Sequence, residues 1–198
     1  MLKPLQRADL ALVDDDVVTQ HTNLGISGNL AGGQGVLFAG KFLAYKGLVQ
    51  DKQVSWLPSY GPEMRGGTAN CSVVLSDTPV GSPIITNPDV LVAMNLPSLQ
   101  KFVDSVVPGG KIFIDSTLIS AKVERSDVEV HYIPATQMAK DAGFSTLANM
   151  ILMGKLMKEC DAVTYDGNKE TLESFIPAKK ANLIDINCKA LQMGYDHQ

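Results

Sequence analysis

The sequence is poor in cysteine, in aromatic residues and in long apolar runs, and each shortage excludes a class of protein. Among 198 residues there are three cysteines, Cys71, Cys160 and Cys188, which lie far apart and form no C-x-x-C pair. This pattern argues against a disulfide framework, a zinc ribbon and a cysteine-ligated iron–sulfur cluster. We therefore expect reduced and mostly buried thiols, as in a cytoplasmic protein.

The chain also has no concentrated charge of one sign. Lysine and arginine number 17 against 21 acidic residues, the net charge is −4, and aromatic residues make up 6%. A nucleic-acid-binding protein is expected to show a basic stripe, which is missing here. The apolar runs are too short to span a membrane, and residues 1–20 are interpreted as a polar, irregular lead-in and not as a signal peptide.

Histidine is equally scarce. His21, His131 and His197 show no metal-ligand spacing, so the sequence predicts no metal site. His131 lies in a strand-like run and is interpreted as a packed or hydrogen-bonded side chain. No residue is predicted to be catalytic.

The chain alternates between strand-like and helix-like segments. Short runs rich in β-branched residues predict strands, and apolar residues at helical spacing predict helices. The order of these segments predicts a single α/β domain over residues 1–198 with a largely parallel sheet covered on both faces. Ligands bind such sheets at the edge where strand carboxyl ends and helix starts meet. The expected strands are 22–26, 54–57, 70–76, 89–94, 111–115 and 128–133, and the expected helices are 36–45, 99–106, 145–160 and 179–195, with 179–198 forming the C-terminal helix and tail.

The strongest helical segment is residues 145–160, for which Ser145 or Thr146 is the candidate N-cap. This segment is apolar on nearly all sides, so we expect it to be buried, either in the core of the chain or against a partner subunit. We favour the partner because the rest of the domain is small. Gly154 in the helix interior is expected to admit another backbone at close range.

A glycine-rich segment, Gly32, Gly33, Gln34 and Gly35, directly precedes the helix expected from Val36. Glycines at this position let backbone N–H groups approach an anion at the positive end of the helix dipole. The same pattern also suits a tight strand-to-helix turn without a ligand, which is the commoner outcome for short glycine patterns. No lysine follows as in a P-loop and the Rossmann spacing is imperfect, so a nucleoside triphosphatase is excluded and a dinucleotide site is disfavoured.

The segment from Ser59 to Thr68, called here the central segment, is the most distinctive part of the chain. Its glycines and proline favour turns, and its charged groups need partners if they are buried. Such loops carry recognition chemistry on a rigid scaffold. Arg65 is able to hold a carboxylate or phosphate through two hydrogen bonds, or to pair with Glu63 and only lock the loop, and both interpretations remain open. The candidate residues are Ser59, Tyr60, Glu63, Arg65, Gly66, Gly67 and Thr68.

Together these motifs resemble the gamma subunit of the 2-oxoacid:ferredoxin (or 2-oxoacid:acceptor) oxidoreductases, over roughly residues 22–195. The resemblance is most specific at residues 56–71, where the form of residues 62–68 is closer to the 2-oxoglutarate and 2-oxoisovalerate branch than to the pyruvate branch. Leu30 departs from the family pattern, which has a glycine there. Further matching positions are residues 32–36, Ala39, Gly40, 82–84, Asp89, 93–95, 108–110, Pro134, Ala135, Asn149, Met150, Gly154, Asn187 and Ala190.

The resemblance implies a three-layer α/β/α domain with a mostly parallel, mixed sheet. It implies a multi-subunit enzyme that oxidatively decarboxylates a 2-oxoacid with coenzyme A, giving an acyl-CoA, carbon dioxide and reduced ferredoxin. Alpha and beta partners then hold thiamine diphosphate, and a ferredoxin-like delta subunit or domain holds the iron–sulfur clusters, so this chain alone binds neither. Its own role is implied to lie near coenzyme A, through Gly32, Gly33, Gln34, Gly35, Ser59, Tyr60, Glu63, Arg65, Gly66, Gly67 and Thr68.

Two other functions fit the residues. One is a free-standing α/β module that binds a phosphorylated ligand as a monomer or homodimer. The other is a purely structural subunit that holds an assembly together. As a subunit, the isolated chain is expected to be inactive and to self-associate through apolar surface meant for partners. The substrate pocket is expected mostly in other chains, so the sequence does not identify the 2-oxoacid.

Overall fold

A computed structural model describes residues 21–29, 35–59, 68–144 and 146–198. These residues form a mixed six-stranded sheet with the order β2-β3-β1-β4-β5-β6. β1, β4, β5 and β6 are parallel to one another, whereas β3 is antiparallel to β1 and β2. The predicted α/β class with a mostly parallel, mixed sheet is confirmed. The strands are β1 (His21–Asn29), β2 (Gln53–Ser59), β3 (Thr68–Ser76), β4 (Val90–Ala93), β5 (Lys111–Asp115) and β6 (Glu129–Ile133).

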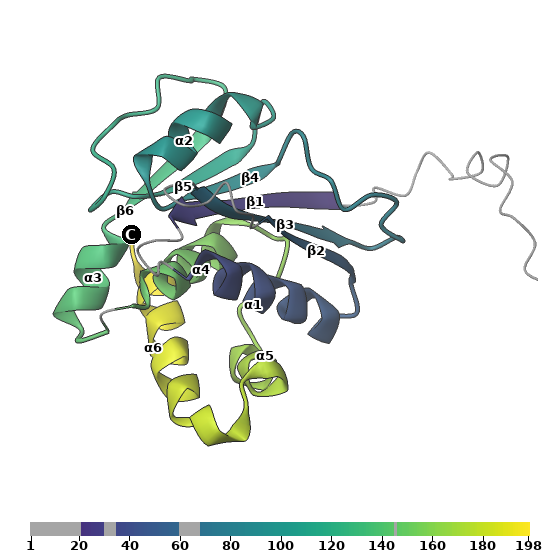
Figure 1. The fold of residues 1–198 in the computed structure, drawn as a ribbon, viewed down its shortest axis with the longest axis vertical. Coiled ribbons are helices and arrows are strands. Elements are labelled where there is room, and N and C mark those ends of the chain that lie inside the picture. Colours follow the sequence, from purple (N-terminus) through teal and green to yellow (C-terminus); the bar gives the residue numbers. More distant parts are fainter. Residues whose placement is uncertain (1–20, 30–34, 60–67, 145) are drawn as a thin grey trace, which may run out of the picture.

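Helices cover both faces of the sheet (Figure 1). α2 lies on one face, and α1, α4 and α6 lie on the other, which gives the expected three layers. In the described part of the chain, no helix is both long and apolar enough to cross a membrane. The helices are α1 (Val36–Val49), α2 (Leu96–Phe102), α3 (Ala135–Asp141), α4 (Ala148–Glu159), α5 (Asn168–Phe175) and α6 (Asn182–Asp196), with 3-10 turns at Val103–Ser105 and Ala178–Lys180.

The central strand β4 is buried on both faces, as its continuous apolar run predicts. Val90 and Val92 join the core that β4 shares with α1 and α4, whereas Leu91 and Ala93 join the core under α2. Phe113 of β5 continues the first of these cores. Because successive side chains of a strand point to opposite faces, one short run supplies two separate cores.

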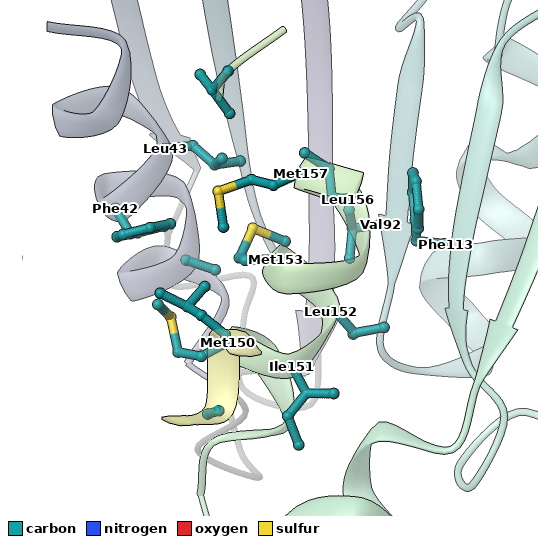
Figure 2. Close-up of a cluster of buried hydrophobic side chains, with 14 of the residues drawn as sticks. Phe42, Leu43, Val92, Phe113, Met150, Ile151, Leu152, Met153, Leu156 and Met157 are labelled. Carbon is teal, nitrogen blue, oxygen red and sulfur yellow. The ribbon is translucent and has the colours of Figure 1, made fainter. Parts of the chain in front are cut away.

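α4 is the most deeply buried helix and lies beside α1, against the sheet (Figure 2). Its residues Met150, Ile151, Leu152, Met153 and Leu156 have no exposed surface. The expectation that a partner subunit covers this helix is wrong, because α1, α3, α6 and β5 of the same chain enclose it. The predicted cap is also wrong: the helix begins at Ala148 with Leu147 at the N-cap and no side-chain cap, and Ser145 lies outside the described residues.

Two glycines bring α4 and α6 into direct backbone contact. A Cβ atom added to Gly154 of α4 would lie 1.9 Å from the carbonyl oxygen of Leu191 in α6. A Cβ atom added to Gly194 of α6 would lie 1.8 Å from the carbonyl oxygen of Ile151 in α4. The prediction that Gly154 admits another backbone is therefore confirmed, and the contact is reciprocal.

The differences from the predicted elements concern short helices and the start of the C-terminal helix. α3 and α5 have 7 and 8 residues and are not predicted, because such lengths give few repeats of the helical period. The C-terminal helix begins at Asn182 and not at Lys179, since residues 178–180 form a 3-10 turn. The expectation that the cysteines are mostly buried is confirmed, since Cys71 and Cys160 are buried and Cys188 is half-buried, and none of the three is paired.

Lys46 ties α1 to the segment before α5. Its side chain is fully buried and donates hydrogen bonds to the carbonyl oxygens of Tyr165, at 3.5 Å, and Asp166. Burial disfavours the ammonium form and lowers the Lys46 pKa to about 8, although the nearby carboxylates of Asp166 and Glu170 oppose the shift. The buried space between α1 and the segment before α5 therefore contains a side chain that can bind or release a proton.

Gly154→Ala is expected to lower the free energy of unfolding by more than about 2 kcal/mol, because the new methyl group forces α4 and α6 apart. The measurement is urea unfolding followed by circular dichroism. Gly81→Ala is the matched control, since no atom lies within 4 Å of its added Cβ. Equal stability of the two variants would contradict the proposed backbone contact.

Lys46→Met is expected to change how stability depends on pH. The unfolded lysine binds its proton up to its ordinary pKa of 10.5 and the folded one only up to about 8, so between these pKa values the unfolded state holds more protons. The native lysine form therefore gains stability as pH rises through this window, by about 3 kcal/mol at most. Urea unfolding at pH 7, 8, 9 and about 10 measures the difference between the two proteins. A constant difference across that range contradicts the prediction.

Candidate functional site

The structure describes only some of the residues of the predicted site. Gly35, Ser59 and the backbone of Thr68 belong to the described part of the chain. Their positions can therefore be compared with the prediction. The predicted contacts of the remaining candidates stay predictions, because these residues lie outside the described ranges: Gly32, Gly33, Gln34, Tyr60, Glu63, Arg65, Gly66 and Gly67.

The flanks of the two predicted segments lie at one edge of the sheet. Asn29, the last residue of β1, is paired in register with Thr68, the first residue of β3. Ser59, the last residue of β2, is paired with Asn70 of β3. The start of the glycine segment and both ends of the central segment therefore lie at the same edge of the sheet. This edge is the one at the carboxyl end of β1.

Gly35 begins α1 in a conformation that suits glycine. Its φ is 71° and its ψ is 25°, in the left-handed region. The side-chain amide nitrogen of Asn149 donates a hydrogen bond of 3.0 Å to the Gly35 carbonyl oxygen. A Cβ atom on Gly35 would lie 2.6 Å from that nitrogen. Both backbone conformation and close packing therefore exclude a side chain here.

The first turn of α1 is pressed against the start of β3. The Cys71 Sγ atom lies 3.6 Å from the Val36 carbonyl oxygen. Gly40 makes this approach possible, since a Cβ atom there would lie 2.3 Å from the same sulfur atom. Because Cys71 is three residues after Thr68, the contact fixes the start of α1 beside the end of the central segment.

The electrostatics of this edge favour an anion. α1 is 14 residues long, has no acidic residue in its first turn and has no side-chain cap on its N-terminus. The N–H groups of its first turn and its dipole therefore give this edge a positive potential. The arrangement suits binding of a phosphate or carboxylate group.

Nucleophilic chemistry is not supported at this position. Burial raises the pKa of the Cys71 thiol to about 12, although hydrogen bonds from Trp56 and Gly40 oppose the shift. The thiol therefore remains protonated at neutral pH, and Cys71 acts in packing.

A small cavity of about 170 Å³ lies on the other face of β3. Asn70 and Ser72 alternate with Cys71 along the strand, so their side chains point away from α1. The cavity combines an apolar floor with polar groups and one lysine. Its lining residues are Asn70, Cys71, Ser72, Ile85, Thr86, Pro88, Leu91, Lys101, Phe102 and Ser105.

Asp115 is a buried carboxylate at the same edge that sequence reasoning missed. It ends β5 and has no exposed surface. It accepts hydrogen bonds from the Thr117 backbone N–H at 3.1 Å and from the Thr136 hydroxyl at 2.5 Å. These bonds join the carboxyl end of β5 to the start of α3, so Asp115 stabilises this edge.

Asn149 is the second residue whose role the sequence did not reveal. It is 2% exposed, and its contact with Gly35 spans 114 residues of sequence. The available signal is a polar side chain within an otherwise apolar helical run. His131, by contrast, is packed as predicted, since its ring stacks on Phe113 with centroids 4.7 Å apart.

Comparisons with known proteins agree with this architecture. The family described as "Pyruvate ferredoxin/flavodoxin oxidoreductase" matches residues 26–197. Ketoisovalerate oxidoreductase subunit VorA of Methanothermobacter thermautotrophicus is 40% identical over 164 residues, which are 82% of this chain and 34% of that protein. 2-Oxoglutarate synthase subunit KorC of Methanocaldococcus jannaschii is 31% identical over 83% of this chain and 88% of its own. The chain spans about a third of the length of the first curated relatives that it matches.

Solved structures show the same fold. The gamma subunit of a keto/oxoacid ferredoxin oxidoreductase from Geobacter sulfurreducens PCA superposes with a TM-score of 0.72 and 28% identity, covering 88% of this chain and 96% of that one. A 2-oxoglutarate:ferredoxin oxidoreductase from Magnetococcus marinus, solved with 2-oxoglutarate, coenzyme A and succinyl-CoA bound, gives a TM-score of 0.78 over 89% of this chain and 30% of that one. At 23% identity, the second match speaks for the fold alone.

Gly35→Ala is expected to destabilise the protein more than Gly109→Ala. Both glycines have positive φ, 71° and 80°, but no atom lies within 4 Å of a Cβ added to Gly109. Each variant loses about 1 kcal/mol to the left-handed backbone, and Gly35→Ala loses more because it displaces Asn149. Free energies of unfolding in urea measure the difference. The difference in free energy of unfolding should shrink when Asn149→Ala is added to Gly35→Ala. Equal losses in the two single variants would contradict the close packing of Asn149 on Gly35.

Proposed function

Since the chain belongs to the pyruvate ferredoxin/flavodoxin oxidoreductase family, we propose that it is the gamma-type domain of a 2-oxoacid:ferredoxin oxidoreductase. The complete enzyme would decarboxylate a 2-oxoacid with coenzyme A to an acyl-CoA and carbon dioxide, and would reduce ferredoxin. The domain occurs as most of a gamma chain in Geobacter sulfurreducens and as about a third of VorA, so it serves either as a subunit or as part of a longer chain.

One observation carries this proposal: the flanks of the glycine segment and of the central segment share one sheet edge, beside the uncapped start of α1. Asn29 and Thr68 are paired across β1 and β3, and Gly35 begins α1 against the same strand. Two segments that start from one edge are placed to act on one ligand or one partner surface. This arrangement supports a joint role for Gly32, Gly33, Gln34, Gly35 and residues 59–68.

Coenzyme A is the ligand class that fits this edge. Its phosphate groups match the N–H groups of an uncapped helix start and the fork of Arg65. Bound coenzyme A supplies the thiol that receives the acyl group. The chain's own part is to hold and orient the phosphate end, through the glycine segment and the central segment. Glu63 and Tyr60 would position Arg65 and not transfer protons.

The other cofactors are assigned to partner chains. Cys71 and Cys160 are both buried with pKa values raised to about 12, mainly by burial, and Cys188 lies on α6. Protonated, separated thiols do not suit an iron–sulfur cluster, whose ligands are thiolates. We assign the clusters to a ferredoxin-like delta subunit or domain, and thiamine diphosphate to alpha and beta partners.

The substrate class follows from the relatives and from the central segment. VorA and KorC carry the names of ketoisovalerate and 2-oxoglutarate enzymes, and the form of residues 62–68 points to the same branch. We therefore infer a branched-chain 2-oxoacid or 2-oxoglutarate as substrate. We also propose that residues 1–198 act as one domain and that the complex works in the cytoplasm.

Arg65→Ala in the assembled enzyme tests the proposal. We expect the apparent KM for coenzyme A to rise about tenfold or more, because a charged hydrogen bond to phosphate is worth about 1.5–3 kcal/mol. The KM for the 2-oxoacid should stay unchanged, since its pocket lies in other chains. Steady-state kinetics with ferredoxin reduction as readout give both constants.

Arg65→Lys is the matched variant, since it keeps the charge and loses the two-pronged geometry. It should fall between the native enzyme and Arg65→Ala. Size-exclusion chromatography of the purified complex checks assembly. Kinetic constants equal to those of the native enzyme in both variants would contradict the proposed role in binding coenzyme A. Loss of assembly in Arg65→Ala alone would favour a purely structural subunit.

A further inference from the structure

A second group of chemically active side chains lies at the opposite end of the parallel strands. Glu129 and His131 belong to β6, and Glu159 is the last residue of α4. One ligand atom from each residue lies within 4.8 Å of the other two. Because β6 is parallel to β5 and Glu129 begins it, this group lies at the amino ends of these strands, away from the carboxyl edge that holds Gly35.

His131 presents an available nitrogen to this group. Its Nε2 atom is buried and forms no hydrogen bond among the described residues, although it lies 3.0 Å from Oε1 of Glu129. The ring is nearly parallel to the Phe113 ring, at an angle of 11° and a centroid distance of 4.7 Å. Stacking therefore fixes the plane of the imidazole and the direction of its nitrogen.

Two lysines orient the carboxylates without using all their oxygens. Lys111 contacts Oε2 of Glu129, which leaves Oε1 beside His131. Lys155 contacts Oε1 of Glu159 at 2.7 Å and also donates to the His197 carbonyl oxygen at 2.9 Å. A group that binds one oxygen of a carboxylate also orients the other oxygen, as outer-shell partners do in known metal sites.

We propose that Glu129, His131 and Glu159 bind a divalent first-row transition-metal ion, with zinc as the best match. Carboxylate oxygens and an imidazole nitrogen are zinc ligands, and three protein ligands with one water complete a tetrahedral site. The imidazole disfavours magnesium and calcium, which prefer oxygen ligands alone. The ion would cross-link β6 to the end of α4.

This site departs from the expectation, drawn from sequence spacing, that the chain has no metal site. Glu159 is 28 residues after His131 in sequence and reaches it only because α4 packs along the sheet. Lys111 opposes the ion, because its ammonium group neutralises part of the carboxylate charge. Its side chain is 28% exposed and is able to move into solvent.

The test uses the full chain without a histidine tag, cleared of metal by a chelator. Isothermal titration with zinc chloride should give one ion per chain. Glu129→Gln, His131→Gln and Glu159→Gln should each weaken binding at least tenfold. Glu173→Gln, which changes a glutamate outside the group, should leave the affinity unchanged. Cobalt(II) should give the intense visible absorption of a four-coordinate site in the native chain.

Lys111→Met provides a result that an ion-pair network alone would not give. Loss of the opposing charge should tighten zinc binding several-fold, whereas Lys140→Met, which changes a lysine of α3, should not. Circular dichroism checks that each variant is folded. If His131→Gln does not fold, Glu129→Gln decides, because this carboxylate is about half exposed. Absence of zinc binding, or binding that survives Glu129→Gln and Glu159→Gln, overturns the proposal.

Discussion

The backbone contact between α4 and α6 at Gly154 and Gly194 is the constraint on which the rest of the structure depends. It holds the apolar α4 beside α1 and against the sheet, so that Met150 and Leu156 are fully buried. The same helix contributes residues at both ends of the parallel strands. Asn149 in its first turn contacts Gly35 at one edge, and Glu159 at its end faces His131 at the other. Any displacement of α4 would therefore disturb both places together.

Much of the fold could be predicted because single strands carry their own signal. The apolar runs around Val92 and Phe113 identify two central strands, since short apolar runs rich in β-branched residues are typical of buried strands. The sequence failed where the answer depended on distant packing. A helix that is apolar on all sides can be buried equally well against a partner subunit or in the core of its own chain. Only the positions of α1 and α6 show that α4 is buried in its own chain. The short helices α3 and α5 carry too few turns to show a period.

The two candidate segments stand out in the sequence, whereas the residues that support their flanks do not. Glycine before Val36 and the unusual composition of residues 59–68 identify both segments from sequence, and the register of Asn29 with Thr68 brings their flanks to one edge. The amide of Asn149 and the carboxylate of Asp115 were missed, because each acts through partners that sequence does not connect. The group around His131 was missed for the same reason: its third member comes from another element.

The strand order itself has a consequence for the carboxyl end of β1. After β1 the chain passes through α1 on one face of the sheet and continues to β2 and β3, whereas after the neighbouring parallel strand β4 it passes through α2 on the other face (Figure 1). The two connections therefore lead to opposite faces of the sheet, which is the kind of position where ligands of open α/β sheets bind. The residues of either connection can therefore change during evolution while the strands keep this position in place.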